Sequence, residues 1–246
     1  MSRAETAGRT ALDAADPRAP SASAAAPTRR QAEKAQRRLD LLAAAGRLFG
    51  RYGYSAVALD EIGSEVGVSG QAIYRHFAGK QDLLGQLLIG VSERLLEAGR
   101  AIRSEEGDPS VRLDRLIAHQ VGFAMGSPDI IRIQDQELLR LTDGDRRRVR
   151  RMQREYVDIW SAALQQLHPW AGVLELRTRV HAVFGLINST EHSMRHLREA
   201  GPDETADSAR LLAAMARAAI RVEHRPVEHS PVAHRPDDHT SPTGEG

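Results

Sequence analysis

The sequence predicts an all-α fold, in which an N-terminal three-helix domain with a helix-turn-helix precedes a larger helical domain. Three observations support this. Apolar residues recur at three- and four-residue spacing through most of residues 31–222, no stretch of useful length alternates like a half-buried strand, and glycine or proline separates the helical stretches. With 246 residues, 41% of them hydrophobic, the chain can bury a sizeable core.

The N-terminal helices are short and separated by glycines. Apolar spacing predicts a first helix that begins near residue 31 and ends at Gly53, a residue type favoured just beyond a helix. A second helix over about residues 59–66 and a third over 70–77 follow, with Gly67 between them. Two short helices around a tight glycine turn predict a helix-turn-helix.

The rest of the chain reads as longer amphipathic helices. We expect them to begin at about residue 80 and to cover about residues 110–125, 128–139, 146–167, 174–198 and 204–222. The expected organisation is a disordered leader (1–28), the helix-turn-helix domain (29–84), the larger helical domain (85–222) and a disordered tail rich in histidine and proline (223–246).

Composition narrows the possible functions. The net charge is +1, and the modest positive excess lies in residues 29–84, with nine Lys and Arg against six Asp and Glu. The absence of cysteine excludes disulfides, thiolate metal sites and cysteine nucleophiles. No apolar signal segment or membrane span is evident, which predicts a cytoplasmic protein. No nucleophile motif or phosphate loop indicates an enzyme, and no cofactor is expected.

One segment resembles a known family in detail. YGYSAVALDEIGSEVGVSGQAIYRHFAGKQDLL, residues 52–84, is similar to the DNA-binding domain of the TetR family of transcriptional regulators. The matching features, in register, are Tyr52-Gly53-Tyr54, Ile62 and Val66, Gly67-Val68-Ser69, Ile73-Tyr74-Arg75-His76-Phe77, Lys80 and Leu83-Leu84. The resemblance implies a regulator that binds double-stranded operator DNA as a homodimer, with the last two long helices forming the dimer interface.

The third helix presents the residues expected to contact DNA. Its outward positions supply Gln71 and Arg75, whose side chains can pair bidentately with adenine and guanine. The resemblance implies phosphate contacts by Tyr74, His76 and Lys80, with Ser69 close to the DNA, and Gly70 is expected to face outward with them. Packing or solvation is the alternative for Tyr74, His76 and Lys80.

Two details concern the borders of this domain. Val57-Ala58 precedes the second helix where the family has a capping residue, so Glu61 is expected to lack a capping-box partner. A basic stretch leads into the first helix and either reaches a neighbouring phosphate or is solvated surface. It comprises Arg29, Arg30, Lys34, Arg37 and Arg38.

The larger domain is expected to hold a small-molecule effector in a mostly apolar pocket. The candidate lining residues are Phe123, Gln134, Glu137, Tyr156, Trp160, Phe184, Asn188 and His192. A polar run on an apolar helix, followed by a helix that starts basic, resembles the TetR regulators of lipid breakdown that respond to acyl-CoA thioesters. Six arginines between residues 146 and 154 suit phosphates, although solvated surface is the alternative.

The main alternative function is metal sensing. His192 and His196 are one helical turn apart, and His224, His229, His234 and His239 recur every five residues in the tail. A metal-responsive regulator or metal-binding protein would use these histidines. The favoured prediction remains a repressor released from its operator by a hydrophobic or acyl-CoA-like effector.

Overall fold

A computed structural model describes residues 28–189 and 201–223, so the expected leader and most of the expected tail lie outside the described residues. The chain divides into two units, residues 1–39 and 40–246. In the first unit the described residues are helical, and its basic side chains at positions 29, 30, 34 and 37 are exposed. Thr28 pairs with Gln31 at its start, and Arg29 Nε lies 2.8 Å from Glu33 Oε1.

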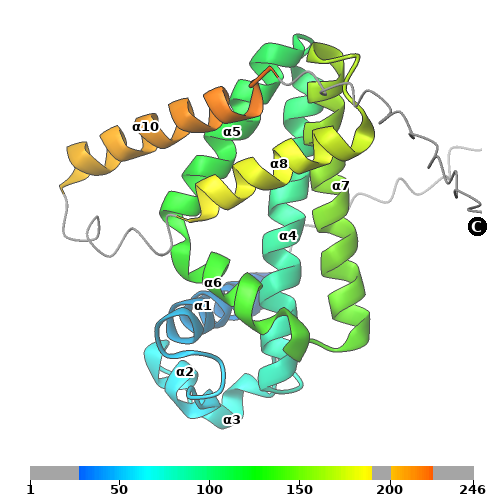
Figure 1. Cartoon of the computed structure of the whole chain (residues 1–246). Coiled ribbons are helices and arrows are strands. Elements are labelled where there is room, and N and C mark those ends of the chain that lie inside the picture. Colours follow the sequence, from blue (N-terminus) through cyan, green and yellow to red (C-terminus); the bar gives the residue numbers. More distant parts are fainter. Residues whose placement is uncertain (1–27, 190–200, 224–246) are drawn as a thin grey trace, which may run out of the picture. The chain divides into compact units, whose positions relative to one another are not determined.

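The described residues form helices without strands, in agreement with the predicted all-α class (Figure 1). The helices are α1 (Arg29–Tyr52), α2 (Leu59–Glu65), α3 (Gly70–Ile73), α4 (Lys80–Glu105), α5 (Pro109–Gly126), α6 (Pro128–Glu137), the 3₁₀ helix η1 (Leu138–Arg140), α7 (Asp143–Leu167), α8 (Val173–Asn188) and α10 (Pro202–Ile220). None of these helices is both long and apolar enough to cross a membrane.

Short polar side chains begin several of these helices. Ser69 Oγ accepts a hydrogen bond from the Ala72 amide, and Asp108 Oδ1 accepts from the amides at the start of α5. Thr142 Oγ1 does the same for Asp145 at the start of α7. Gly53 ends α1 with a φ of 83°, a conformation that costs glycine little.

The core of the larger unit lies where α4, α5, α7 and α8 pack together, and α4 runs alongside α7 (Figure 1). Trp160 on α7 is completely buried there. Ion pairs and a hydrogen bond hold the C-terminal end of α10. The Asp114 carboxylate on α5 pairs with Arg217 and Arg221, and buried Arg179 on α8 donates a hydrogen bond to the Val222 carbonyl at 2.5 Å. The last helix is therefore held at its C-terminal end by specific bonds as well as by packing.

Some boundaries differ from the prediction. The α-helix α3 ends at Ile73, because the following amides bond tightly back, with His76 N 2.8 Å from Ile73 O. Helix α4 runs from Lys80 to Glu105 and begins where the sequence predicted a long helix. Leu39 belongs to the apolar spacing that predicted the first helix, but its side chain is 57% exposed.

Candidate DNA-reading surface and ligand cavity

The helix-turn-helix is closed by a small apolar core. Ile62, Ile73 and Phe77 are buried, as their spacing predicted. Helix α2 lies so close to the turn before α3 that a Cβ on Gly63 would be 2.6 Å from the Val68 carbonyl oxygen. This packing fixes the direction in which α3 presents its outer face.

Helix α3 and the turn that follows it present three exposed polar side chains, Gln71 on the helix and Tyr74 and Arg75 directly after it. Within the described part of the chain, their side chains form no hydrogen bond or ion pair with the rest of the protein. They form a surface of donors that is open to a docking partner. Gly70 differs from the expectation, because it is buried against Asp60, whose Oδ1 would lie 1.7 Å from a Cβ on the glycine.

The predicted residues at either end of α3 have local bonds. Ser69 is exposed but uses its hydroxyl to cap α3, and His76 is partly buried. The expectation that Glu61 lacks a capping partner was wrong, because its Oε2 accepts a hydrogen bond from the Ala58 amide at 2.6 Å. An alanine serves at that position since the bond uses its backbone N–H rather than a side chain.

Lys80 points back toward the protein. Its Nζ lies 4.6 Å from the centre of the Tyr54 ring and donates to the Ser55 carbonyl at 3.4 Å. Burial lowers the pKa of Lys80, and the nearby charge of Arg140 lowers it further. The arrangement ties the start of α4 to the loop that follows α1.

Glu137 lies beside this loop and is not among the residues that line the cavity. Its carboxylate is buried, with Arg140 Nε at 2.5 Å and the Tyr54 amide, which donates to it, at 3.4 Å. The Arg140 guanidinium also lies 5.5 Å from the centre of the Tyr54 ring, the same ring that Lys80 contacts. Glu137 was predicted to line the pocket because it is a polar residue on an otherwise apolar helix. Its carboxylate instead accepts a hydrogen bond from the backbone of Tyr54, which is 83 residues away in sequence.

A cavity of about 280 Å³ lies within the larger domain. Five predicted residues line it: Phe123, Gln134, Tyr156, Phe184 and Asn188. Trp160 is absent from its wall and lies behind it in the core, and His192 lies outside the described residues. The residues that the prediction missed are Ser92, Leu95, Gln120, Asp135, Met152, Gln153, Val157 and His181.

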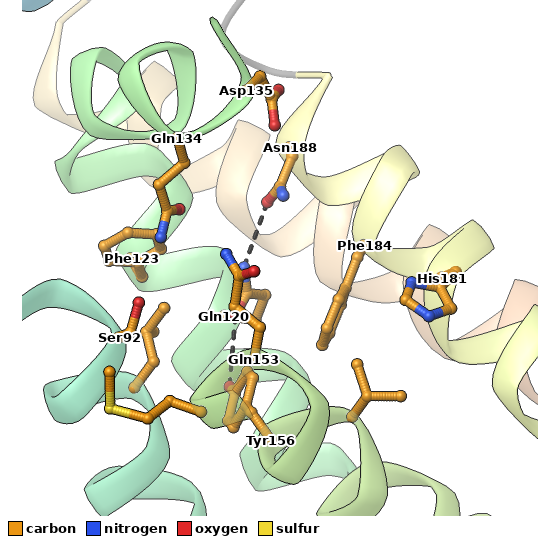
Figure 2. A pocket seen from close by; sticks show the side chains of 13 residues that line it. Ser92, Gln120, Phe123, Gln134, Asp135, Gln153, Tyr156, His181, Phe184 and Asn188 are labelled. Carbon is orange, nitrogen blue, oxygen red and sulfur yellow. Dashed lines mark hydrogen bonds between the residues drawn. The ribbon is translucent and has the colours of Figure 1, made fainter. Parts of the chain in front are cut away.

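Hydrogen bonds connect three side chains of the cavity wall in series (Figure 2). The Tyr156 hydroxyl donates to Gln120 Oε1 at 3.3 Å, and Gln120 Nε2 donates to Asn188 Oδ1 at 3.2 Å. We call Tyr156, Gln120 and Asn188 the amide relay. Burial raises the pKa of Tyr156, so its phenol stays neutral.

Aromatic rings back the relay. The rings of Tyr156 and Phe184 are stacked with centroids 5.8 Å apart, and Trp160 meets Phe184 edge-on at 5.0 Å. Such contacts add stability beyond the area that they bury. The rings of Tyr156, Trp160 and Phe184 therefore pack against one another where α7 and α8 meet the relay.

The arginines of α7 lie on its outer side. Arg148 pairs with Glu93 at 2.5 Å and Arg146 pairs with Asp143, while Arg147, Arg150, Arg151 and Arg154 are exposed. None of the six lines the cavity.

The described residues contain no group of three or more histidines and acids that could hold a metal ion. His192, His196 and the tail histidines from His224 onward, on which the metal alternative depends, lie outside the described residues.

Comparison with known proteins identifies the two halves of the chain. Residues 41–87 match the family model for bacterial regulatory proteins of the tetR family, and residues 106–220 match the C-terminal domain of tetracycline-repressor-like proteins. Among solved structures, a TetR-family transcriptional regulator from Bordetella parapertussis superimposes with a TM-score of 0.65 at 22% identity, covering 75% of this chain and 93% of that one. FadR from Bacillus subtilis, solved in complex with stearoyl-CoA, gives 0.59 at 18% identity, covering 76% and 99%. At these identities the likeness shows the fold alone.

Curated relatives match a shorter stretch. The nucleoid occlusion factor SlmA of Alteromonas mediterranea is 30% identical over 118 residues, 48% of this chain and 60% of that protein. SlmA of Shewanella pealeana is 34% identical over 90 residues, 37% of this chain and 45% of that protein. The chain thus spans about half the length of these relatives. The two family models together cover most of the described residues, and the chain belongs to the TetR family of bacterial regulatory proteins.

Proposed function

We propose that this protein is a DNA-binding transcriptional regulator, a homodimeric repressor that a small molecule releases from its operator. The observation that carries the proposal is the exposed polar surface of α3 and the turn after it, on a helix-turn-helix whose apolar core is buried. Gln71 and Arg75 read bases in the major groove, while Tyr74 contacts phosphate, with Ser69, Gly70 and His76 at the border of the contact surface. Such a protein acts in the cytoplasm, where its DNA is.

Lys80 contributes to DNA binding in a second way. Its contacts with Tyr54 and Ser55 hold the loop after α1 against the start of α4, directly after the reading helix. Its charge still attracts phosphate over a distance, because the side chain is only partly buried. Lys80 therefore both positions the reading head and adds to its attraction for DNA.

Dimerisation through α8 and α10 is supported by apolar side chains that the single chain leaves exposed. On α10, Leu211 is 63% exposed and Met215 is 48% exposed, and Ala218 follows on the same face. On α8, Val173 and Leu174 are 70% and 81% exposed. A second copy would cover these faces and would place two reading helices on neighbouring half-sites.

Helix α6 links the cavity to the reading head. Gln134 and Asp135 line the cavity from this helix. On the same helix, Arg132 Nη1 donates to the Gly50 carbonyl at 2.6 Å, and Glu137 holds the Tyr54 amide. An effector that displaces α6 must strain these bonds, so it binds more tightly to one arrangement of the head than to the other.

The size of the cavity bears on the effector. A volume of about 280 Å³ is at the lower end for small-molecule sites. Of the effectors expected from the sequence, a small hydrophobic molecule therefore fits this cavity better than a long-chain acyl-CoA thioester. A thioester would require the cavity to widen, with its phosphates outside near the arginines of α7.

The test is binding of the purified full chain to genomic DNA fragments, including its own upstream region, with and without a panel of small hydrophobic molecules and acyl-CoA thioesters. Specific binding that one compound releases supports the proposal and identifies the effector class. Glu137→Gln should bind the same fragment but respond less to that compound, because the link from α6 to Tyr54 is weakened. Absence of specific DNA binding under all conditions would contradict the proposed regulator. Specific DNA binding that no compound releases would keep the DNA-binding function and contradict the release by a small molecule.

A further inference from the structure

The amide relay has a direction that bears on the chemistry of the effector. Burial keeps the Tyr156 phenol neutral, and the hydroxyl faces the oxygen of the Gln120 amide, so the O–H donates and this oxygen accepts. The nitrogen of the same amide then faces Asn188 and donates to its Oδ1. Because the Asn188 oxygen is used in this way, the relay ends in the N–H donors of Asn188 Nδ2.

The end of the relay lies in the wall of the cavity, where Asn188 is only partly buried (Figure 2). Two other amides, Gln134 and Gln153, line the same space and form no hydrogen bond within the described part of the chain. Asn188 differs from them because its orientation is set by two further side chains. A fixed donor favours one type of ligand atom, whereas a rotatable amide accommodates several.

Part of the remaining wall is apolar and flat, beside the polar side chains of Ser92, Gln134, Asp135, Gln153 and His181. Phe123, Leu95 and Met152 contribute apolar surface, and the Phe184 ring is held by its contacts with Tyr156 and Trp160. Together with the volume of about 280 Å³, these side chains suit one compact ring system.

We propose that the effector is a compact, uncharged ring compound whose carbonyl oxygen accepts a hydrogen bond from Asn188 Nδ2. The inference rests on the proposed function, because it names the class of molecule that the regulatory cavity takes. A pure hydrocarbon that covers the Asn188 donors leaves them without a partner, which costs free energy. A carboxylate would face the Asp135 carboxylate in the same wall.

Four compounds with one skeleton separate these chemistries: 1-indanone, indane, 1-aminoindane as its ammonium ion, and indane-1-carboxylate. Binding of each to the full chain is measured by isothermal titration calorimetry at pH 7.5. We expect 1-indanone to bind about 2- to 10-fold more tightly than indane, the range for one net hydrogen bond. The carboxylate should bind more weakly than the ketone because it faces Asp135, and the ammonium ion should do so because it offers no acceptor to Asn188 Nδ2.

Two substitutions at one position test the assignment to Asn188. Asn188→Leu keeps the approximate size but removes the donors, so the preference for 1-indanone over indane should fall to about onefold. Asn188→Asp can still accept from Gln120 but offers an acceptor in place of the donors, so it should shift preference from the ketone toward the ammonium ion. Gln166→Leu is the control, because it replaces an exposed amide of α7 outside the cavity and should retain the ketone preference.

The inference is overturned if indane binds as well as 1-indanone, if a charged analogue binds most tightly, if none of the four binds up to its solubility limit, or if Asn188→Leu keeps the preference. DNA binding of the same samples is measured separately. Loss of specific DNA binding in the unaltered chain counts against the proposed function, whereas intact DNA binding with the wrong ligand preference counts against this inference alone. Thermal unfolding of each variant confirms that the cavity is still folded.

Discussion

The reading head and the ligand cavity hold their polar side chains in different ways. Gln71 on α3 and Arg75 in the turn after it are exposed and have no side-chain bond within the described residues. In the cavity, Tyr156, Gln120 and Asn188 are bonded to one another in series. The hydrogen-bonding groups of Gln71 and Arg75 therefore remain available to a partner, whereas those of the amide relay are already oriented by one another.

This difference separates the consequences of substitution. An exposed side chain without internal bonds contributes little to folding, so its removal should affect binding alone. A buried polar side chain that is bonded contributes to both, because its removal leaves a partner unsatisfied. Helix α6 touches both regions, so changes beside it should affect stability and DNA binding together.

The largest expected effect is at the head. Arg75→Ala should weaken binding to a specific DNA fragment by about 5- to 150-fold per half-site, the range for one bidentate base contact, with an unchanged Tm. Fluorescence anisotropy with the specific fragment and with scrambled DNA measures both affinity and preference. Arg154→Ala, which removes an exposed arginine from α7, is the matched control and should bind as the parent does. An equal loss on both DNAs would show that Arg75 does not read sequence.

An intermediate effect is expected where α6 meets the head. A Cβ on Gly50 would lie 2.2 Å from the Asp129 Cβ and 2.9 Å from its Cα, so Gly50→Ala must push α1 and α6 apart. We expect a loss of about 1–3 kcal/mol in the free energy of unfolding, together with altered DNA affinity. Urea unfolding gives the comparison with Gly122→Ala, which has open space and should gain about 0.5–1 kcal/mol. Equal stability of the two variants would refute the close contact.

The smallest effect concerns His168, which is buried like the cavity residues but has no hydrogen bond to either ring nitrogen within the described chain. Burial lowers the pKa of His168, and the Arg179 charge adds to the decrease. Since the unfolded chain takes up the proton more readily, stability should be constant above about pH 6.5 and fall as the pH drops below it.

Urea unfolding at pH 7.5, 6.5 and 5.5 measures this loss, which for one proton stays below about 1.4 kcal/mol per pH unit. His168→Phe should reduce the slope without abolishing it, because burial also lowers the pKa of His119. A slope that the substitution leaves unchanged would assign the pH dependence to other groups.

The sequence predicted the order of the described helices, because apolar spacing and capping residues act locally. Ser69 and Gly53 stand where a cap and a helix end were expected. The site was less predictable. Glu137 and Lys80 were assigned from their positions along the chain, whereas both contact the Tyr54 region, which is distant in sequence from Glu137. Gln120 was missed because an amide on an amphipathic helix has no local signal for a bond to Tyr156.

The contact between Gly50 and Asp129 also has an evolutionary consequence. Because the two helices leave no room for another carbon atom between Gly50 and Asp129, a substitution at one position requires a compensating change at the other. In a lineage where position 50 gains a side chain, position 129 should lose bulk, and the two columns should co-vary although they lie on different helices. In an alignment of diverged regulators, the combined size of these two residues would therefore report the distance between α1 and α6.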